Sequence, residues 1–129
     1  MKRAIFTFYN LSLDTDIVRL QAEVVKKFNT TADFHPLCSQ THGEEVIHPD
    51  AVDYGFNQLF VEEKYDTVLL LDVDCIPLNA YALEYTFEQA EKGKLIGNVQ
   101  RGMHLDNDEH NYVAPSAFCL TRQMYEDFG

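Results

Sequence analysis

The stretch that decides the fold is Thr67-Val68-Leu69-Leu70-Leu71-Asp72-Val73-Asp74, an aliphatic run that ends in two acids. Such a run is typical of a strand that is buried on both faces of a parallel sheet. Open α/β sheets bind their ligands at the carboxyl ends of these strands, where Asp72 and Asp74 stand. Side chains alternate along an extended strand, so the pattern predicts that both carboxylates point the same way. Paired carboxylates of this kind favour Mg²⁺ or Mn²⁺, and hence a metal-bound phosphate ester as substrate.

Strand and helix patterns alternate on either side of this stretch. Apolar runs predict further strands at 4–9, 33–38, 95–99 and 112–120, and Pro36 indicates that the second of these is a weak strand or lies at a sheet edge. Residues 39–48 and 100–111 are polar and predict irregular loops. This alternation of strands and helices predicts a layered α/β domain with a largely parallel sheet.

Three helices are predicted from apolar residues that recur at helical spacing. Their expected buried stripes are Ile17, Leu20, Val24 and Phe28 in the first, Val52, Phe56, Leu59 and Phe60 in the second, and Leu83, Phe87 and Ala90 in the third. Pro49 suits the first turn of the second helix, and Asn79 is suited to cap the third, which Gly93 would end. Thr121 is expected to open a last helical stretch.

Composition narrows the class of partner. Ten Lys and Arg residues stand against 21 Asp and Glu residues, which gives a formal charge of −11 and argues against nucleic-acid binding. The three cysteines include no CxxC pair, so we expect buried, reduced thiols rather than a zinc or disulfide scaffold. Neither a signal segment nor a membrane-spanning stretch is present, and we expect a cytoplasmic protein.

The length of 129 residues fits one domain over 1–129. The last residues, from Met124 to Gly129, have the pattern of a helix that stops mid-course. We therefore expect an incomplete domain that ends after the strand at 112–120.

The segment Tyr65-Asp66-Thr67-Val68-Leu69-Leu70-Leu71-Asp72-Val73-Asp74-Cys75-Ile76-Pro77-Leu78 resembles the DxD region of nucleotide-sugar-dependent glycosyltransferases with the GT-A fold. In that family a hydrophobic strand ends in Asp-x-Asp and is commonly followed by Pro-Leu. The order of elements is similar too, and the segment Ala114-Pro115-Ser116-Ala117-Phe118-Cys119-Leu120 looks like the family's acceptor-side strand. The resemblance implies a Rossmann-like layered α/β sandwich of the nucleotide-diphospho-sugar transferase type, with a mostly parallel sheet and a truncated C-terminus.

The resemblance also implies roles for particular residues. Asp74 would ligate Mn²⁺ or Mg²⁺, and Asp72 would contact the metal or the nucleotide ribose. The first strand ends where the family holds base and ribose, at Thr7, Phe8, Tyr9 and Asn10. The implied substrates are a nucleoside diphosphate sugar, with a UDP-sugar favoured, and an unidentified acceptor.

A catalytic base is not selected by the sequence. An inverting member of the family needs a carboxylate near the acceptor hydroxyl. The candidates are Asp106, Asp108 and Glu109, and nothing in their spacing chooses among them. His104 and His110 in the same segment are further candidates as metal ligands.

Other interpretations stay open. Asp72 and Asp74 are also compatible with solvated strand-end caps, and the aromatic end of the first strand with ordinary core packing. Haloacid-dehalogenase-type phosphatases carry Asp-x-Asp after a buried strand too, although their motif usually sits on the first strand. A third alternative is a non-catalytic, truncated domain that binds sugar nucleotides.

Overall fold

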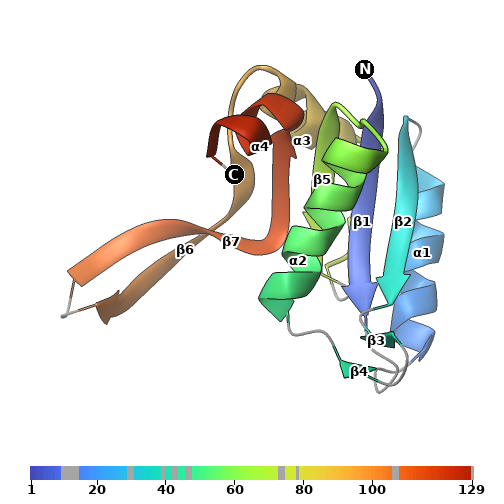
Figure 1. Cartoon of the computed structure of the whole chain (residues 1–129), viewed down its shortest axis with the longest axis horizontal. Helices are drawn as coiled ribbons and strands as arrows, with labels where there is room; N and C mark the ends of the chain where they lie inside the picture. Colours follow the sequence, from blue (N-terminus) through green and yellow to red (C-terminus); the bar gives the residue numbers. More distant parts are fainter. Residues whose placement is uncertain are drawn as a thin grey trace.

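The computed structural model describes residues 1–9, 15–28, 31–38, 40, 41, 44, 45, 48–72, 75–77, 79–105 and 108–128. Among these, the side chains at 15, 40, 41, 44, 45, 48–51, 98–105, 108–116 and 128 are not described. The elements, in chain order, are β1 Arg3–Tyr9, α1 Thr15–Phe28, β2 Ala32–Cys38, β3 Gln40–Thr41, β4 Glu44–Glu45, α2 His48–Asn57, the π-helical turn η1 Gln58–Glu62, β5 Thr67–Leu71, α3 Ala80–Glu91, β6 Ile96–Leu105, β7 Asp108–Thr121 and α4 Arg122–Phe128 (Figure 1).

A five-stranded sheet in the order β2-β1-β5-β7-β6 forms the centre of the fold. β1 pairs in parallel with both β2 and β5, whereas β7 runs antiparallel to its neighbours β5 and β6. The sheet is therefore mostly parallel, and the prediction of an α/β fold class is confirmed. β2 lies at the edge of the sheet, as the proline at position 36 predicted, because a proline nitrogen has no hydrogen to donate to a further strand.

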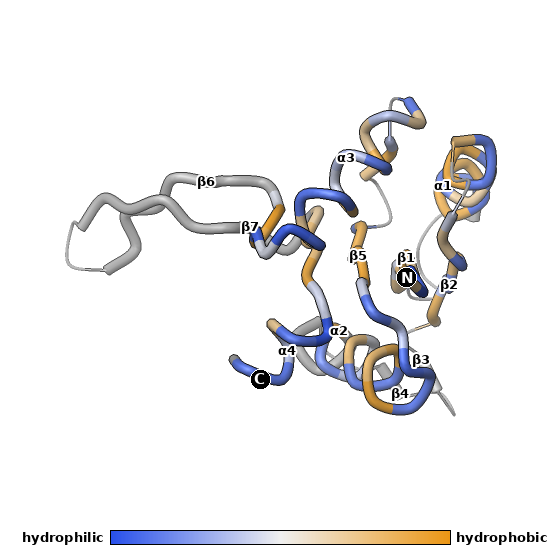
Figure 2. The backbone as a smooth tube through the Cα atoms, turned by 90° about the horizontal axis from the view of Figure 1, so that it is seen from above, coloured by the Kyte–Doolittle hydropathy of each residue, from blue (hydrophilic) through white to orange (hydrophobic). Residues whose placement is uncertain are grey.

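Helices cover both faces of the sheet, and each face has its own apolar cluster. α1 and α3 lie on one side and α2 and α4 on the other, as the view along the sheet shows (Figure 2). The cluster under α1 and α3 includes Ile5, Val25 and Phe87. The cluster under α2 and α4 includes Phe6 and Phe60. The chain is thus a three-layer α/β sandwich over the described residues.

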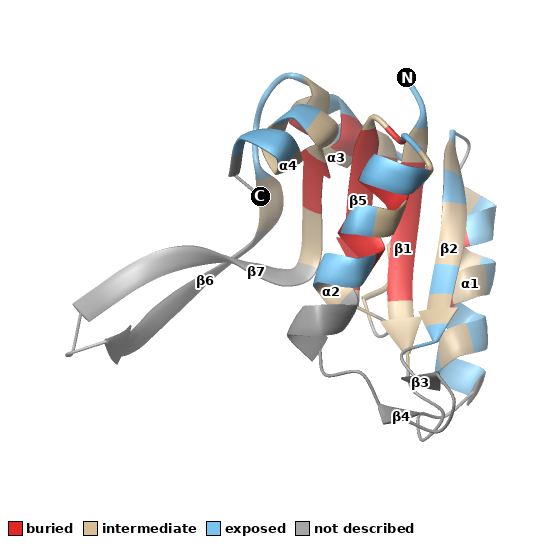
Figure 3. Ribbon diagram, viewed as in Figure 1, coloured by how far each residue is buried: buried red, intermediate tan, exposed pale blue. Residues whose placement is uncertain are grey.

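β5 is the most completely buried strand, as its sequence predicted. All five of its residues are buried (Figure 3). Val68 and Leu70 pack into the cluster beneath α2, whereas Leu69 and Leu71 pack into the cluster beneath α1 and α3. A strand with apolar side chains on both faces is stable only between two helical layers. The strand therefore carries Asp72 out of the core at its carboxyl end.

The predicted helix ends are confirmed where local chemistry sets them. Asn79 caps α3, since its side-chain oxygen accepts a hydrogen bond from the amide of Ala82 at 2.8 Å. Gly93 follows the end of α3 with a φ of 92°, a conformation that glycine adopts without a Cβ clash. Thr121 precedes α4, and its hydroxyl accepts from the amide of Met124.

The buried side of α1 agrees only in part with the predicted one, since Phe28 packs against the core cluster but Ile17 and Leu20 do not. Ile17 and Leu20 are 37% and 49% exposed, while Gln21 and Val25 are fully buried. The helix is thus rotated about its axis relative to the prediction, and a polar residue takes the place expected for an aliphatic one. Side-chain periodicity counts Gln21 as a surface residue, whereas its hydrogen bonds, described below, hold it inside.

Two segments predicted as loops contain strands. Part of 39–48 forms the small antiparallel pair of β3 and β4, and α2 already begins at His48. Most of 100–111 belongs to the antiparallel hairpin of β6 and β7, which extends beyond the rest of the sheet (Figure 1). Cross-strand backbone hydrogen bonds need no apolar alternation, so the polar composition of these segments concealed them.

Within the described part of the chain, no helix is both long enough and apolar enough to cross a membrane. All three cysteines are free thiols, and only Cys119 is buried, whereas Cys38 is exposed and Cys75 is half-buried. The expectation of buried thiols is therefore wrong for Cys38.

Candidate functional site

Two adjacent parallel strands, β1 and β5, end side by side at the point where the chain changes direction across the sheet. From β1 the chain crosses to β2 on one side, and it later returns to β5 on the other side of β1. Open α/β sheets bind ligands outside the carboxyl ends of the two strands at such a switch point. β1 ends at Tyr9, and β5 ends directly before Asp72. The structure therefore brings two of the predicted site segments to the same edge of the sheet.

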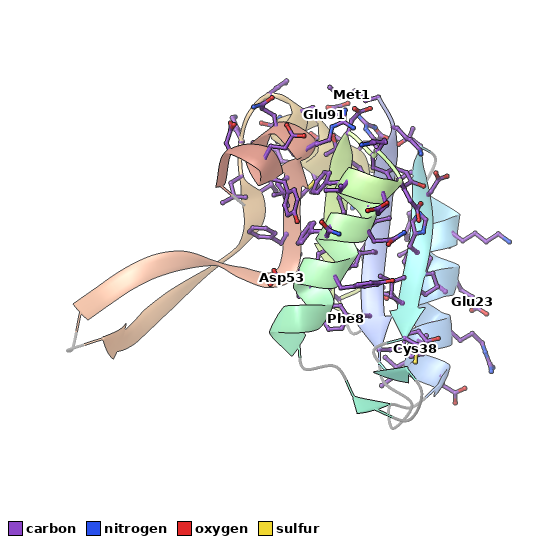
Figure 4. The ribbon with its side chains drawn as sticks, viewed as in Figure 1. Met1, Phe8, Glu23, Cys38, Asp53 and Glu91 are labelled. Carbon is purple, nitrogen blue, oxygen red and sulfur yellow. The ribbon has the colours of Figure 1, made fainter. Side chains whose placement is uncertain are left out.

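The side chains at the end of β1 divide between the two faces of the sheet. Phe6 pairs in register with Leu70, and this register continues to bring Phe8 level with Asp72. Phe8 packs against the cluster beneath α2, the position of a core side chain. It lies at the same end of the sheet as Cys38, and opposite Met1 and Glu91 (Figure 4). Thr7 and Tyr9 alternate with Phe8 and so face the side of α1 and α3.

Thr7 has the most informative side chain at this edge. It is 1% exposed, and its hydroxyl has no hydrogen-bond partner in the part of the chain that the structure describes. A buried hydroxyl without a partner costs about 1–3 kcal/mol relative to one that is paired. An orphaned donor and acceptor at the switch point is the kind of group that a bound ligand can satisfy.

Asp72 is half-buried, and its backbone carbonyl is held on two sides. The carbonyl oxygen accepts from the amide of Cys75 at 2.8 Å and from Nε2 of Gln21 at 2.6 Å. The same Nε2 donates to the carbonyl of Cys75 at 2.9 Å. These bonds tie the residues on both sides of Val73 and Asp74 to α1.

Gln21 is the residue of this region that the sequence analysis missed. Its side-chain nitrogen is paired twice, while its Oε1 has no partner among the described residues. The sequence did contain a signal for its burial, because Gln21 lies three to four positions from apolar residues on each side along the helix. Composition does not distinguish such a residue from a surface glutamine, since the distinction depends on the rotation of the helix.

Several predicted site residues lie outside the described residues. These are Asn10, Asp74 and Asp106. Asp108 and Glu109 belong to β7, but their side chains are not described. Among the described residues, no group of three or more His, Cys, Asp and Glu side chains is arranged to hold a metal ion. Of the two predicted metal ligands, Asp72 and Asp74, only Asp72 is among the described residues.

Among the cavities that the described residues line, two lie at opposite ends of the sheet. The smaller, of about 220 Å³, adjoins the end of β5 and is bounded by Leu71, Cys75, Pro77 and Ala117. Its lining is mainly apolar, so it suits an apolar group better than a diphosphate. The larger, of about 580 Å³, lies at the amino ends of the strands next to Met1 and Arg122. We favour the carboxyl end as the site, because Arg122 in the larger cavity is already paired with Asp66 at 3.0 Å.

The shifted pKa values belong to interactions that stabilise the fold. The Arg3 guanidinium bonds Glu91 and Glu84, and the hydrogen bond with Glu91 is the main cause that raises the pKa of Arg3. A hydrogen bond from Thr31, with help from Arg3, lowers the pKa of Glu84. Arg3 and Glu91 are at the amino end of the sheet. Each of these groups has its partner, so none of them indicates a second reactive centre.

Tyr65, which packs against β2, is a further side chain with a shifted pKa. Its hydroxyl donates to Asp33 Oδ2 at 2.7 Å and lies 3.0 Å from Nε2 of His35. Lys2 places its ammonium 4.2 Å from the centre of the Tyr65 ring. Burial, and then the bond to Asp33, raise the pKa of Tyr65. These contacts hold the edge strand to the turn before β5.

A comparison of the chain with models of known protein families finds no match, and a comparison with curated protein sequences finds none either.

Proposed function

We propose that the chain is a glycosyltransferase domain of the GT-A type that binds a nucleoside diphosphate sugar together with Mn²⁺ or Mg²⁺. The donor is a UDP-sugar in the first instance, and the acceptor is unidentified. The proposal starts from the resemblance of 65–78 to the DxD region of that family.

One observation carries the proposal beyond the motif. Asp72 follows the buried strand β5, and its parallel neighbour β1 carries the orphaned hydroxyl of Thr7 two residues before its end at Tyr9. A strand-end carboxylate and a buried, unpaired hydroxyl thus occur at one topological switch point. If Asp72 were only a solvated cap at the end of its strand, the unpaired hydroxyl of Thr7 would still need an explanation, because a buried hydroxyl is normally paired.

The residues of the chain suit the proposed metal by donor type. Asp72 and Asp74 offer hard carboxylate oxygens, which Mg²⁺ and Mn²⁺ prefer. When bound, the metal supplies Lewis-acid stabilisation of the leaving diphosphate. The chain itself would orient the nucleotide along the end of β1, with Thr7 donating or accepting one hydrogen bond. Tyr9 offers an aromatic ring for the base on the same face.

Calorimetric titration of UDP, and then of GDP, with Mn²⁺ and with a chelator tests the proposal. We expect binding that requires Mn²⁺ and that is abolished in Asp74→Asn with little change in the circular dichroism spectrum. Glu88→Gln is the matched control, since Glu88 is an exposed acid near the end of α3 that is remote from β5's carboxyl end. Equal binding by wild type and Asp74→Asn would refute the metal site.

The alternative functions give different results in the same preparation. Release of phosphate from a generic ester, without nucleotide binding, would favour the haloacid-dehalogenase-type phosphatase. Mn²⁺-dependent UDP binding without any turnover of UDP-sugars would mark a non-catalytic sugar-nucleotide domain.

A further inference from the structure

A buried amide stands in the apolar layer between α1 and the sheet. Gln21 is fully buried, as are Val25 one turn later on α1 and Ile5 on β1. Burying an amide is unfavourable unless its polar atoms are paired. An aliphatic side chain would fill this position without that cost, so the glutamine requires a specific explanation.

The explanation lies in what its nitrogen binds. Nε2 of Gln21 donates to the carbonyl of Asp72 at 2.6 Å and to the carbonyl of Cys75 at 2.9 Å. The Asp72 carbonyl also accepts from the Cys75 amide, so both of its lone pairs are used. A single side chain on α1 therefore holds both ends of the four-residue segment that contains Val73 and Asp74.

We propose that Gln21 is a positioning residue, which holds the backbone of Asp72 and Cys75 so that the carboxylate of Asp72 meets a metal-bound ligand in one arrangement. This inference rests on the proposed function for its ligand, although the effect on the backbone is independent of it. Partners that orient metal ligands act in this way, because a ligand that is already in place loses less conformational freedom on binding.

The unpaired oxygen of Gln21 indicates that this residue does more than stabilise the core. Its Oε1 has no partner among the described residues, so the amide is a poor choice for stability alone. Gln21→Met removes both polar atoms of the side chain. It loses the two hydrogen bonds of Nε2, which lowers the free energy of unfolding, and it also removes the buried, unpaired Oε1, which raises it. The unfolding temperature of Gln21→Met should therefore change little, while the segment around Asp74 loses its attachment.

Two measurements on the full chain test the inference, each on wild type, Gln21→Met and Gln21→Glu. The first is hydrogen exchange at the Cys75 amide without ligand, and the second is the affinity for UDP in Mn²⁺. We expect faster exchange at Cys75 in both variants and a loss in affinity of about 10- to 100-fold, the usual size for partners that orient a metal ligand. Gln21→Glu keeps the shape of the side chain but lacks the two N–H donors, so it removes the attachment without a change in volume.

Val25→Ala is the matched control, because it perturbs the same buried face of α1 without touching the segment. It should lower the unfolding temperature and leave Cys75 exchange and UDP affinity unchanged. Unchanged exchange at Cys75 in Gln21→Met and Gln21→Glu would overturn the positioning role, as would unchanged affinity in a wild type that binds. If wild type binds no UDP, the proposed function fails, and the exchange measurement alone decides the role of Gln21.

Discussion

Replacing Thr7 with valine separates stability from binding. Valine has nearly the shape of threonine, and the change removes only the buried hydroxyl that has no partner among the described residues. Removing an unpaired buried hydroxyl should raise the free energy of unfolding by about 1 kcal/mol. For a domain of this size, that corresponds to a rise in the unfolding temperature of about 3–5 °C.

Thr67→Val is the comparison that makes the result specific. Thr67 is also fully buried, its hydroxyl is also without a partner in the described structure, and it lies at the opposite end of β5. Both variants should be more stable than wild type. Only Thr7→Val should weaken Mn²⁺-dependent UDP binding, by about tenfold, because one hydrogen bond to the ligand is worth about 1.4 kcal/mol.

The assays are urea denaturation, with the slope required to stay unchanged, and calorimetric titration of UDP. A Thr7→Val protein that is less stable than wild type by more than about 1 kcal/mol would refute the reasoning, since the hydroxyl must then be paired in the free protein. Equal losses of affinity in Thr7→Val and Thr67→Val would refute the assignment of Thr7 to the site.

Two further predictions concern the fold that supports the site. Gly55→Ala should destabilise the protein by about 1–2 kcal/mol in urea denaturation, because a Cβ there would overlap the ring of Phe6 and outweigh the helix propensity of alanine; an equally stable variant would contradict this packing. Burial raises the pKa of Tyr65 above its ordinary 10.0 and that of Cys119 above its ordinary 9.0, so the unfolded state releases these protons first and the free energy of unfolding should fall as the pH rises above about 9. The fall should be shallower in Tyr65→Phe but unchanged in the exposed control Tyr81→Phe, and identical pH profiles for both variants would rule out the contribution of Tyr65.

The features that the sequence predicts correctly are those that depend on neighbouring residues. The aliphatic run of β5 needs no partner to be recognised, because its composition alone requires burial on both faces. The cap of α3 is similar, since Asn79 satisfies an amide three residues away. Pro36 places β2 at an edge for an equally local reason.

The features that the sequence does not predict depend on distant residues. The rotation of α1 follows from bonds between Gln21 and carbonyls more than 50 positions later, which periodicity does not include. The apolar runs at 95–99 and 112–120 predicted part of β6 and of β7, but the rest of the hairpin, at 100–105 and 108–111, is held by pairing between polar segments and has no signal in the hydrophobic pattern. The sequence therefore pointed to the candidate site through Asp72 and the ends of β1 and β5. It did not predict the hydrogen bonds by which Gln21 of α1 supports this site.

The positions of the unsatisfied polar atoms give a last argument for the site. Natural sequences agree with local rules almost everywhere, and exceptions concentrate where function requires them. Three buried side-chain polar atoms lack partners in the described structure: Thr7 Oγ1, Gln21 Oε1 and Thr67 Oγ1. Thr7 lies toward the carboxyl end of β1, and Gln21 of α1 bonds the carbonyl of Asp72 directly after β5, whereas Thr67 stands at the other end of β5. If the exceptions at Thr7 and Gln21 serve a ligand, UDP with Mn²⁺ should slow hydrogen exchange around these two residues and leave it unchanged at Thr67. Equal protection at all three would assign the exceptions to the fold alone.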